Sequence, residues 1–154
     1  MAASLIAADT TLTLTRHFDA PPERVFDAWL DPTVISQWIG PRGVQAEATK
    51  LEARVGGAYA ITMHTPDKMD PKVSGAYKEI VRPSRLVFSW MWGHETQETL
   101  VTLTFKASGK GTEMTLQHTN FASAERRDSH NNGWTGSFDK LAEVLAATTA
   151  NKAN

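Results

Sequence analysis

The stretch GWTGSFDKLAEVL, residues 133–145, decides how this chain folds. It carries one apolar stripe whose members are separated by four, three and four residues, namely Trp134, Phe138, Leu141 and Leu145. This spacing is typical of one face of an amphipathic helix. The segments before it look like strands, and a lone amphipathic helix after many strands has to bury its stripe on a sheet. Bulky aromatic side chains at that seam either fill it or leave room for an apolar guest.

Most of the chain upstream of this helix alternates between apolar and polar residues, which predicts strands. Short turn-like segments separate them, so we expect neighbouring strands to be antiparallel. Two short helices are expected after the first strand, one capped by Asp19 and the other begun by Asp31-Pro32. The seven predicted strands are Thr11–Phe18, Gln45–Arg54, Ala58–Thr65, Val73–Val81, Leu86–Trp92, Glu98–Ala107 and Thr112–Thr119.

The predicted fold is α+β, with one curved seven-stranded antiparallel sheet wrapped around the long C-terminal helix. We expect Ser123 to cap this helix. The poor helix formers at 131–133 predict a kink, or a helix that begins only after them. A single domain over residues 10–149 suits the chain length, with loose ends at 1–9 and 150–154.

The composition is that of an ordinary globular domain: 154 residues, 41% hydrophobic and 21% charged. Lys plus Arg number 16 and Asp plus Glu number 17, which gives a net charge of −1. The overall charge therefore does not favour binding to nucleic acid. The absence of cysteine excludes disulfides, thiolate metal sites and cysteine nucleophiles. No stretch approaches the roughly 20 apolar residues of a membrane span and no basic leader is evident, so we expect a cytoplasmic location.

Aromatic residues on the inward faces of the predicted elements are the sharpest candidates for a ligand-binding pocket. Five tryptophans are many for a small domain, and indole walls stack on flat ligands and exclude water. For any single residue the alternative is plain packing in the core. The candidate pocket residues are Trp38, Tyr59, Met63, Tyr77, Trp90, Trp92, Leu103, His118, Trp134 and Phe138.

His118 lies on the inward face of the last predicted strand and is the candidate for acid–base chemistry. A neutral imidazole there would bond a ligand carbonyl or hydroxyl, or act as an acid or base, with Asn120 sharing the task. The alternative is a core histidine that a neighbour satisfies. The run from His94 to Glu98 does not match the zinc-binding helix motif, and the five histidines are scattered, so we expect no metal site and no cofactor.

Several short motifs occur in a fixed order between about Thr11 and Ala147. They are DAPPERVFDAW (19–29), DP (31–32), WIGP (38–41), GG (56–57), GAYKEI (75–80), RLVFSW (85–90), TEMTLQH (112–118) and GW (133–134). This ordered series resembles the START-like, helix-grip superfamily, also called SRPBCC. Within it, the series resembles the branch named for the activator of heat-shock-protein-90 ATPase.

The resemblance implies a seven-stranded sheet that grips the C-terminal helix around an internal cavity. Relatives mostly bind apolar or aromatic small molecules, and a few are polyketide aromatases and cyclases. We therefore expect an intracellular binding module for a lipophilic or aromatic molecule, lipids included. One alternative is an enzyme of aromatase, cyclase or hydrolase type that works in the same cavity through His118.

A second alternative is a co-chaperone-like interaction domain, which the family name implies together with a role in the stress response. The named co-chaperone also needs a separate amino-terminal domain, for which this chain has no room. A chaperone contact therefore has weak support, whereas an unpaired sheet edge would allow a homodimer.

Overall fold

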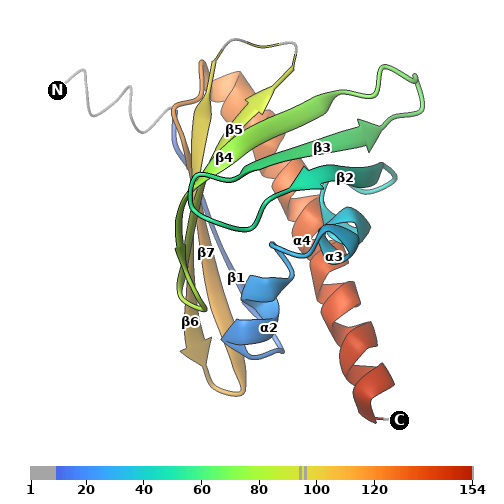
Figure 1. Cartoon of the computed structure of the whole chain (residues 1–154), viewed down its shortest axis with the longest axis vertical. Coiled ribbons are helices and arrows are strands. Elements are labelled where there is room, and N and C mark those ends of the chain that lie inside the picture. Colours follow the sequence, from blue (N-terminus) through green and yellow to red (C-terminus); the bar gives the residue numbers. More distant parts are fainter. Residues whose placement is uncertain (1–9, 94, 96, 154) are drawn as a thin grey trace, which may run out of the picture.

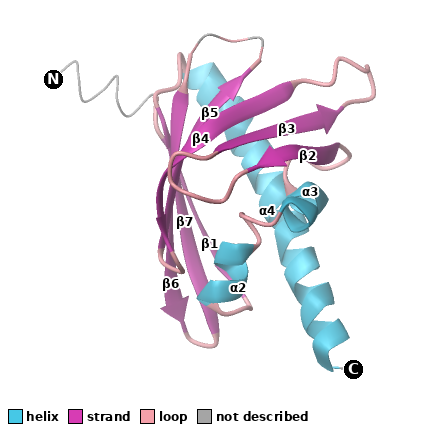
Figure 2. Ribbon diagram, viewed as in Figure 1, coloured by secondary structure: helices cyan, strands magenta, loops and turns pink. Residues whose placement is uncertain are grey.

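The computed structural model describes residues 10–93, 95 and 97–153, and it confirms the predicted α+β fold. Seven antiparallel strands form one curved sheet in the order β1-β7-β6-β5-β4-β3-β2, and the helices lie on its concave side (Figures 1 and 2). The strands are β1 (Leu12–Phe18), β2 (Gln45–Leu51), β3 (Ala58–His64), β4 (Lys72–Val81), β5 (Arg85–Trp92), β6 (Thr99–Ser108) and β7 (Gly111–Thr119). The helices are α2 (Pro22–Asp27), α3 (Pro32–Trp38) and α4 (Ala124–Ala153).

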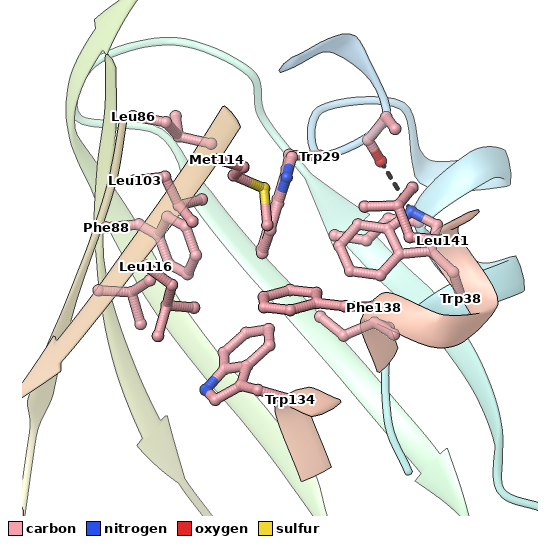
Figure 3. Close-up of a cluster of buried hydrophobic side chains, with 14 of the residues drawn as sticks. Trp29, Trp38, Leu86, Phe88, Leu103, Met114, Leu116, Trp134, Phe138 and Leu141 are labelled. Carbon is pink, nitrogen blue, oxygen red and sulfur yellow. Dashed lines mark hydrogen bonds between the residues drawn. The ribbon is translucent and has the colours of Figure 1, made fainter. Parts of the chain in front are cut away.

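The predicted stripe of α4 is the part of the helix that meets the sheet. Trp134, Phe138, Leu141 and Leu145 are all buried, with exposed fractions of 0 to 6%. Figure 3 shows Trp134 and Phe138 reaching toward the sheet residues Leu103 and Leu116, with Trp29 beside them. Because both surfaces are apolar, this contact forms the main core.

Two helix starts follow the prediction. The Asp31 carboxylate accepts hydrogen bonds from the backbone amides of Thr33 and Val34, at 2.9 and 3.3 Å, and caps α3. The Ser123 hydroxyl accepts one from the Arg126 amide at 3.2 Å and caps α4. These bonds satisfy amides that the first helical turn leaves without a partner.

The prediction for Asp19 is wrong, and so is the alternative that the last helix begins only after residues 131–133, while a kink at these residues stays a prediction. Asp19 does not cap α2, because this helix begins at Pro22 with Pro21 in the capping position and no side-chain cap. Asp19 therefore comes too early to reach the first amides. The helix α4 does not wait for the end of 131–133 but runs through these residues from Ala124. The buried stripe that follows them holds the segment helical despite its poor propensity.

The sheet bends, so that β2, β3 and β4 run across α4 while β1, β6 and β7 form a second, steeper wall (Figure 1). Register shifts between Ala48 and Lys50 and between Tyr77 and Glu79 mark β-bulges, which increase strand twist. The helix α3 packs against both β2 and α4. The loop 39–44 is thereby brought beside the N-terminal half of α4.

The loose ends predicted at 1–9 and 150–154 stay predictions. Residues 1–9 and 154 lie outside the described residues, and for 150–153 only the helical backbone is described. The run that begins at His94 is likewise incomplete, because residues 94 and 96 lie outside the described part of the chain.

Candidate ligand-binding cleft

A cleft of about 260 Å³ lies between the N-terminal half of α4, the ends of β3 and β5, and the loop 39–44. Four of the predicted pocket residues line it: Met63, Trp90, Trp92 and Trp134. The rings of Trp90 and Trp134 lie 4.9 Å apart, and those of Trp90 and Trp92 lie 5.7 Å apart and nearly perpendicular. Three indoles therefore form a rigid, largely apolar corner at the junction of sheet and helix.

Six of the predicted pocket residues do not line this cleft: Trp38, Tyr59, Tyr77, Leu103, His118 and Phe138. All six are at most 4% exposed and belong to the packed core. Trp38 donates to the carbonyl of Ala28 at 3.1 Å (Figure 3), and the Tyr59 hydroxyl donates to that of Ser89. The void beside Tyr59 and Tyr77 has only about 10 Å³, which suits no more than one water molecule. Burial raises the pKa of both tyrosines.

His118 is fully buried, and both of its ring nitrogens have protein partners. The indole N–H of Trp134 donates to Nδ1 at 3.1 Å, so Nδ1 is unprotonated and Nε2 carries the proton. Nε2 lies 2.7 Å from the Thr99 hydroxyl, which in turn donates to the carbonyl of Trp90 at 2.8 Å. Burial lowers the pKa of His118 well below its usual value, which keeps the ring neutral. These are the contacts of a satisfied core histidine, and Asn120 does not join them because its side-chain amide donates to the Glu98 carbonyl.

His130, which sequence reasoning missed, does line the cleft. Its Nε2 accepts from the indole N–H of Trp92 at 3.0 Å, and its Nδ1 donates to the carbonyl of Arg126 at 2.8 Å. Burial lowers its pKa. Its ring lies 5.2 Å from that of His118, so the two neutral imidazoles and their tryptophan donors form one cluster.

The loop wall of the cleft is tied to α4. The Ser137 hydroxyl accepts from the amide of Gly40 at 2.8 Å and lies within hydrogen-bonding distance of the Gly40 and Gly133 carbonyls. The Lys140 ammonium lies 3.3 to 3.4 Å from the carbonyls of Ile39, Pro41 and Val44. The partial burial that accompanies these contacts lowers the pKa of Lys140. The cleft therefore has a fixed wall on each side.

The remaining lining residues were not predicted, although part of the signal is in the sequence. Arg126, Ser129, His130, Gly133 and Ser137 extend the helical face of Trp134 by the same spacing of three and four residues. Extending the stripe toward the helix start in steps of four residues would have found His130 and Arg126. Ile39, Gly40, Pro41, Val44 and Thr65 come from loops and from the end of α3, for which no periodicity exists.

The mouth of the cleft carries one ion pair, between Arg126 and Glu95. Among the described residues, no group of three or more His, Asp or Glu side chains is arranged to hold a metal ion. No described helix is both long and apolar enough to cross a membrane. The lining itself combines apolar side chains with polar ones from α4 and Thr65.

Residues 19–146 match the model of a protein family described as activator of Hsp90 ATPase homolog 1-like protein. The chain belongs to this family. None of the curated proteins matches it at a significant level. Solved structures that resemble it include three bacterial proteins that cover nearly the whole fold.

A protein from Chromobacterium violaceum is 27% identical, with a TM-score of 0.83 over 88% of this chain and 96% of its own. A protein from Rhodobacter sphaeroides is 28% identical, with a TM-score of 0.81 over 92% and 95%. An AHSA1 protein from Silicibacter pomeroyi is 29% identical, with a TM-score of 0.79 over 90% and 99%. The Hsp90 ATPase activator-like family has a fold that is known to bind ligands, and in this member the cleft occupies the seam between sheet and helix.

Proposed function

We propose that this protein binds a small lipophilic or aromatic molecule in the cleft between α4 and the ends of β3 and β5. The observation that carries the proposal is the cleft itself, with about 260 Å³ of space against three indole rings. Packed cores contain few voids larger than a water molecule. An apolar space of this size at a junction of elements is a usual place for a ligand.

The hydrogen bonds of the two histidines favour binding over acid–base catalysis. His118 lies outside the cleft lining, and His130, which lines it, uses both ring nitrogens within the protein. A general acid or base needs a free nitrogen within reach of the substrate. The enzyme alternative therefore gains no support from these contacts. The chaperone contact and the homodimer remain predictions that nothing in the structure bears on.

The test uses tetralin, a ten-carbon apolar molecule with a flat ring, as the probe. Binding should quench tryptophan emission, because three of the five tryptophans line the cleft. For a ligand of this size, a dissociation constant on the order of 0.1 mM is expected. At a concentration equal to that constant, Tm should rise by about 1 °C.

A variant that fills the cleft provides the decisive comparison. Gly133 lines the cleft, and a Cβ added there has no heavy atom within 4 Å apart from its chain neighbours and the backbone of its own helix, so Gly133→Leu should fold and place its side chain in the cleft. We expect it to weaken tetralin binding at least tenfold. Thr135→Leu places the same side chain on an exposed part of α4 and is the matched control. Equal tetralin affinity in both variants would contradict the proposal.

A further inference from the structure

The polar side chains that line the cleft differ in charge and in whether the protein already satisfies them. The hydroxyl groups of Thr65 and Ser137 and both ring nitrogens of His130 take part in hydrogen bonds within the protein. Ser129 is exposed and neutral, and burial keeps His130 neutral as well. No acidic side chain of the described residues lines the cleft. Within the described lining, Arg126 is therefore the residue that carries a full charge.

The guanidinium group of Arg126 lies at the mouth of the cleft, where its ion pair joins the two walls. Arg126 belongs to the first turn of α4, and it donates to Glu95, which follows the end of β5. The Glu95 amide in turn donates to the carbonyl of Trp92 at 3.0 Å, and Trp92 lines the cleft. The charges of Arg126 and Glu95 both act on the pKa of His130, another lining residue. The charged end of Arg126, and not only its aliphatic stem, is therefore beside the cleft.

Glu95 uses only part of what this guanidinium group offers. The bond runs from one terminal nitrogen, Nη2, and neither Nε nor Nη1 of Arg126 has a partner among the described residues. A guanidinium group carries five N–H donors in a geometry that suits carboxylates. Glu95 lines a separate void of about 10 Å³, whereas Arg126 lines both that void and the cleft. A second carboxylate can thus reach Arg126 from the side of the cleft.

The size of the cleft limits the apolar part of a ligand. An apolar cavity of about 150 Å³ is enough to bind benzene. The cleft has about 260 Å³, which suits one or two rings against the indoles. A polar substituent on such a ring system would lie toward the mouth, where water and Arg126 replace its hydration.

We propose that the cleft takes an aromatic carboxylate of one or two rings, with its rings against the indoles and its carboxylate paired with Arg126 at the mouth. The inference rests on the proposed function and adds the chemical class of the ligand. In this arrangement Arg126 selects the charge of the ligand. Glu95 opposes binding, because its own carboxylate repels the incoming one and occupies one of the donors.

The test compares tetralin-6-carboxylic acid with tetralin-6-carboxamide, two ligands that share the tetralin skeleton. At pH 7 the acid is ionised, since carboxyl groups have pKa values near 4. Water solvates a carboxylate far better than an amide, so burial alone would make the amide the tighter ligand. We expect the wild-type protein to bind the acid at least about fivefold more tightly than the amide in about 0.15 M salt. The ratio of these two affinities is the acid preference.

Two matched pairs of variants locate the contact. Arg126→Gln should reduce the acid preference to about one or less. Arg42→Gln removes an arginine that is likewise paired with a glutamate, Glu143, but does not line the cleft, so it should change the preference by less than about twofold. Glu95→Gln should raise the preference at least about fourfold, and Glu143→Gln should change it by less than about twofold. Because the preference is a ratio within one variant, a general loss of affinity cancels.

The outcomes separate the two proposals. If tetralin fails to bind the wild-type protein, the proposed function fails with its simplest ligand. If tetralin binds and the acid is not preferred over the amide, only the carboxylate class is overturned. An acid preference that survives in Arg126→Gln, or that Arg42→Gln abolishes to the same extent, would overturn the role of Arg126. If Arg126→Gln does not fold, Glu95→Gln decides, because an unchanged preference there would overturn the same contact.

Discussion

Gly133 and Gly136 lie three positions apart on α4, and a methyl group would meet different surroundings at each. At Gly133 an added Cβ has no neighbour within 4 Å apart from the adjacent residues and the backbone of its own helix. At Gly136 it would lie 3.1 Å from the amide nitrogen of Arg42 and 3.4 Å from Cα of Pro41. Gly136 thus has a packing reason to be glycine, whereas Gly133 has none within the protein.

This difference predicts opposite effects for the same substitution. Glycine inside a helix is less stable than alanine by about 0.5–1 kcal/mol, so Gly133→Ala should raise the free energy of unfolding by that amount. Gly136→Ala should lower it by about 1 kcal/mol, because the backbone of the tied loop has to move. Urea denaturation of both variants measures the two signs. A stabilised Gly136→Ala would mean that α4 and the loop pack less closely than described.

Between elements, Ser137 is the connection that holds the loop wall of the cleft to α4. Ser137→Ala leaves the buried amide of Gly40 without its acceptor, which should cost about 1–3 kcal/mol of stability. Asn132→Ala changes an exposed position on the same helix that does not line the cleft, and it should not lower stability, because alanine is the better helix former. Tetralin affinity should fall in Ser137→Ala alone, as the wall loosens. If Ser137→Ala changed neither stability nor tetralin affinity, the hydrogen bond between Ser137 and Gly40 would not be what holds the loop wall in place.

The elements show why the fold was predictable and the site only partly so. The apolar stripe of α4 repeats with the helical period over twelve residues, from Trp134 to Leu145, so it can be recognised from the sequence alone. The helical turns that carry His130 and Gly133 follow the same period, so the half of the cleft lining that α4 provides could have been predicted. The hydrogen bond from the Gly40 amide to the Ser137 hydroxyl joins residues 97 positions apart, and no local sequence pattern predicts such a contact.

His118 illustrates the limit on predicting a role from a position. Strand alternation placed it on the inward face, and it is buried there. Which atoms complete its hydrogen bonds depends on how α4 crosses β7 and on Thr99 of the neighbouring strand. The same inward position is compatible with a ligand contact and with a core bond, so only the tertiary arrangement decides between them.

For the whole molecule, the cluster of His118 and His130 links stability to pH. Each ring accepts an indole N–H on one nitrogen, and protonation of that nitrogen would remove the acceptor. Burial lowers both pKa values, so the folded chain resists protonation at a pH where the unfolded chain, with an ordinary pKa near 6.5, takes up the proton. Stability should therefore be complete above pH 6.5 and decline as the pH falls below it.

The size of this decline follows from proton linkage. Each histidine that is protonated only in the unfolded chain lowers the free energy of unfolding by about 1.4 kcal/mol for each unit of pH below its unfolded pKa. Urea denaturation between pH 7 and 5 measures this slope, because most carboxylates titrate only at lower pH. His64 is an internal control, because hydrogen bonds to Glu47 and Asp70 raise its pKa instead of lowering it. Its contribution to stability is therefore present at low pH and is lost only as the pH rises through that raised pKa. NMR titration should show His64 protonated while His118 stays neutral. A flat stability profile, or a His118 signal that titrates together with that of His64, would contradict the buried hydrogen bonds on which the cleft wall depends.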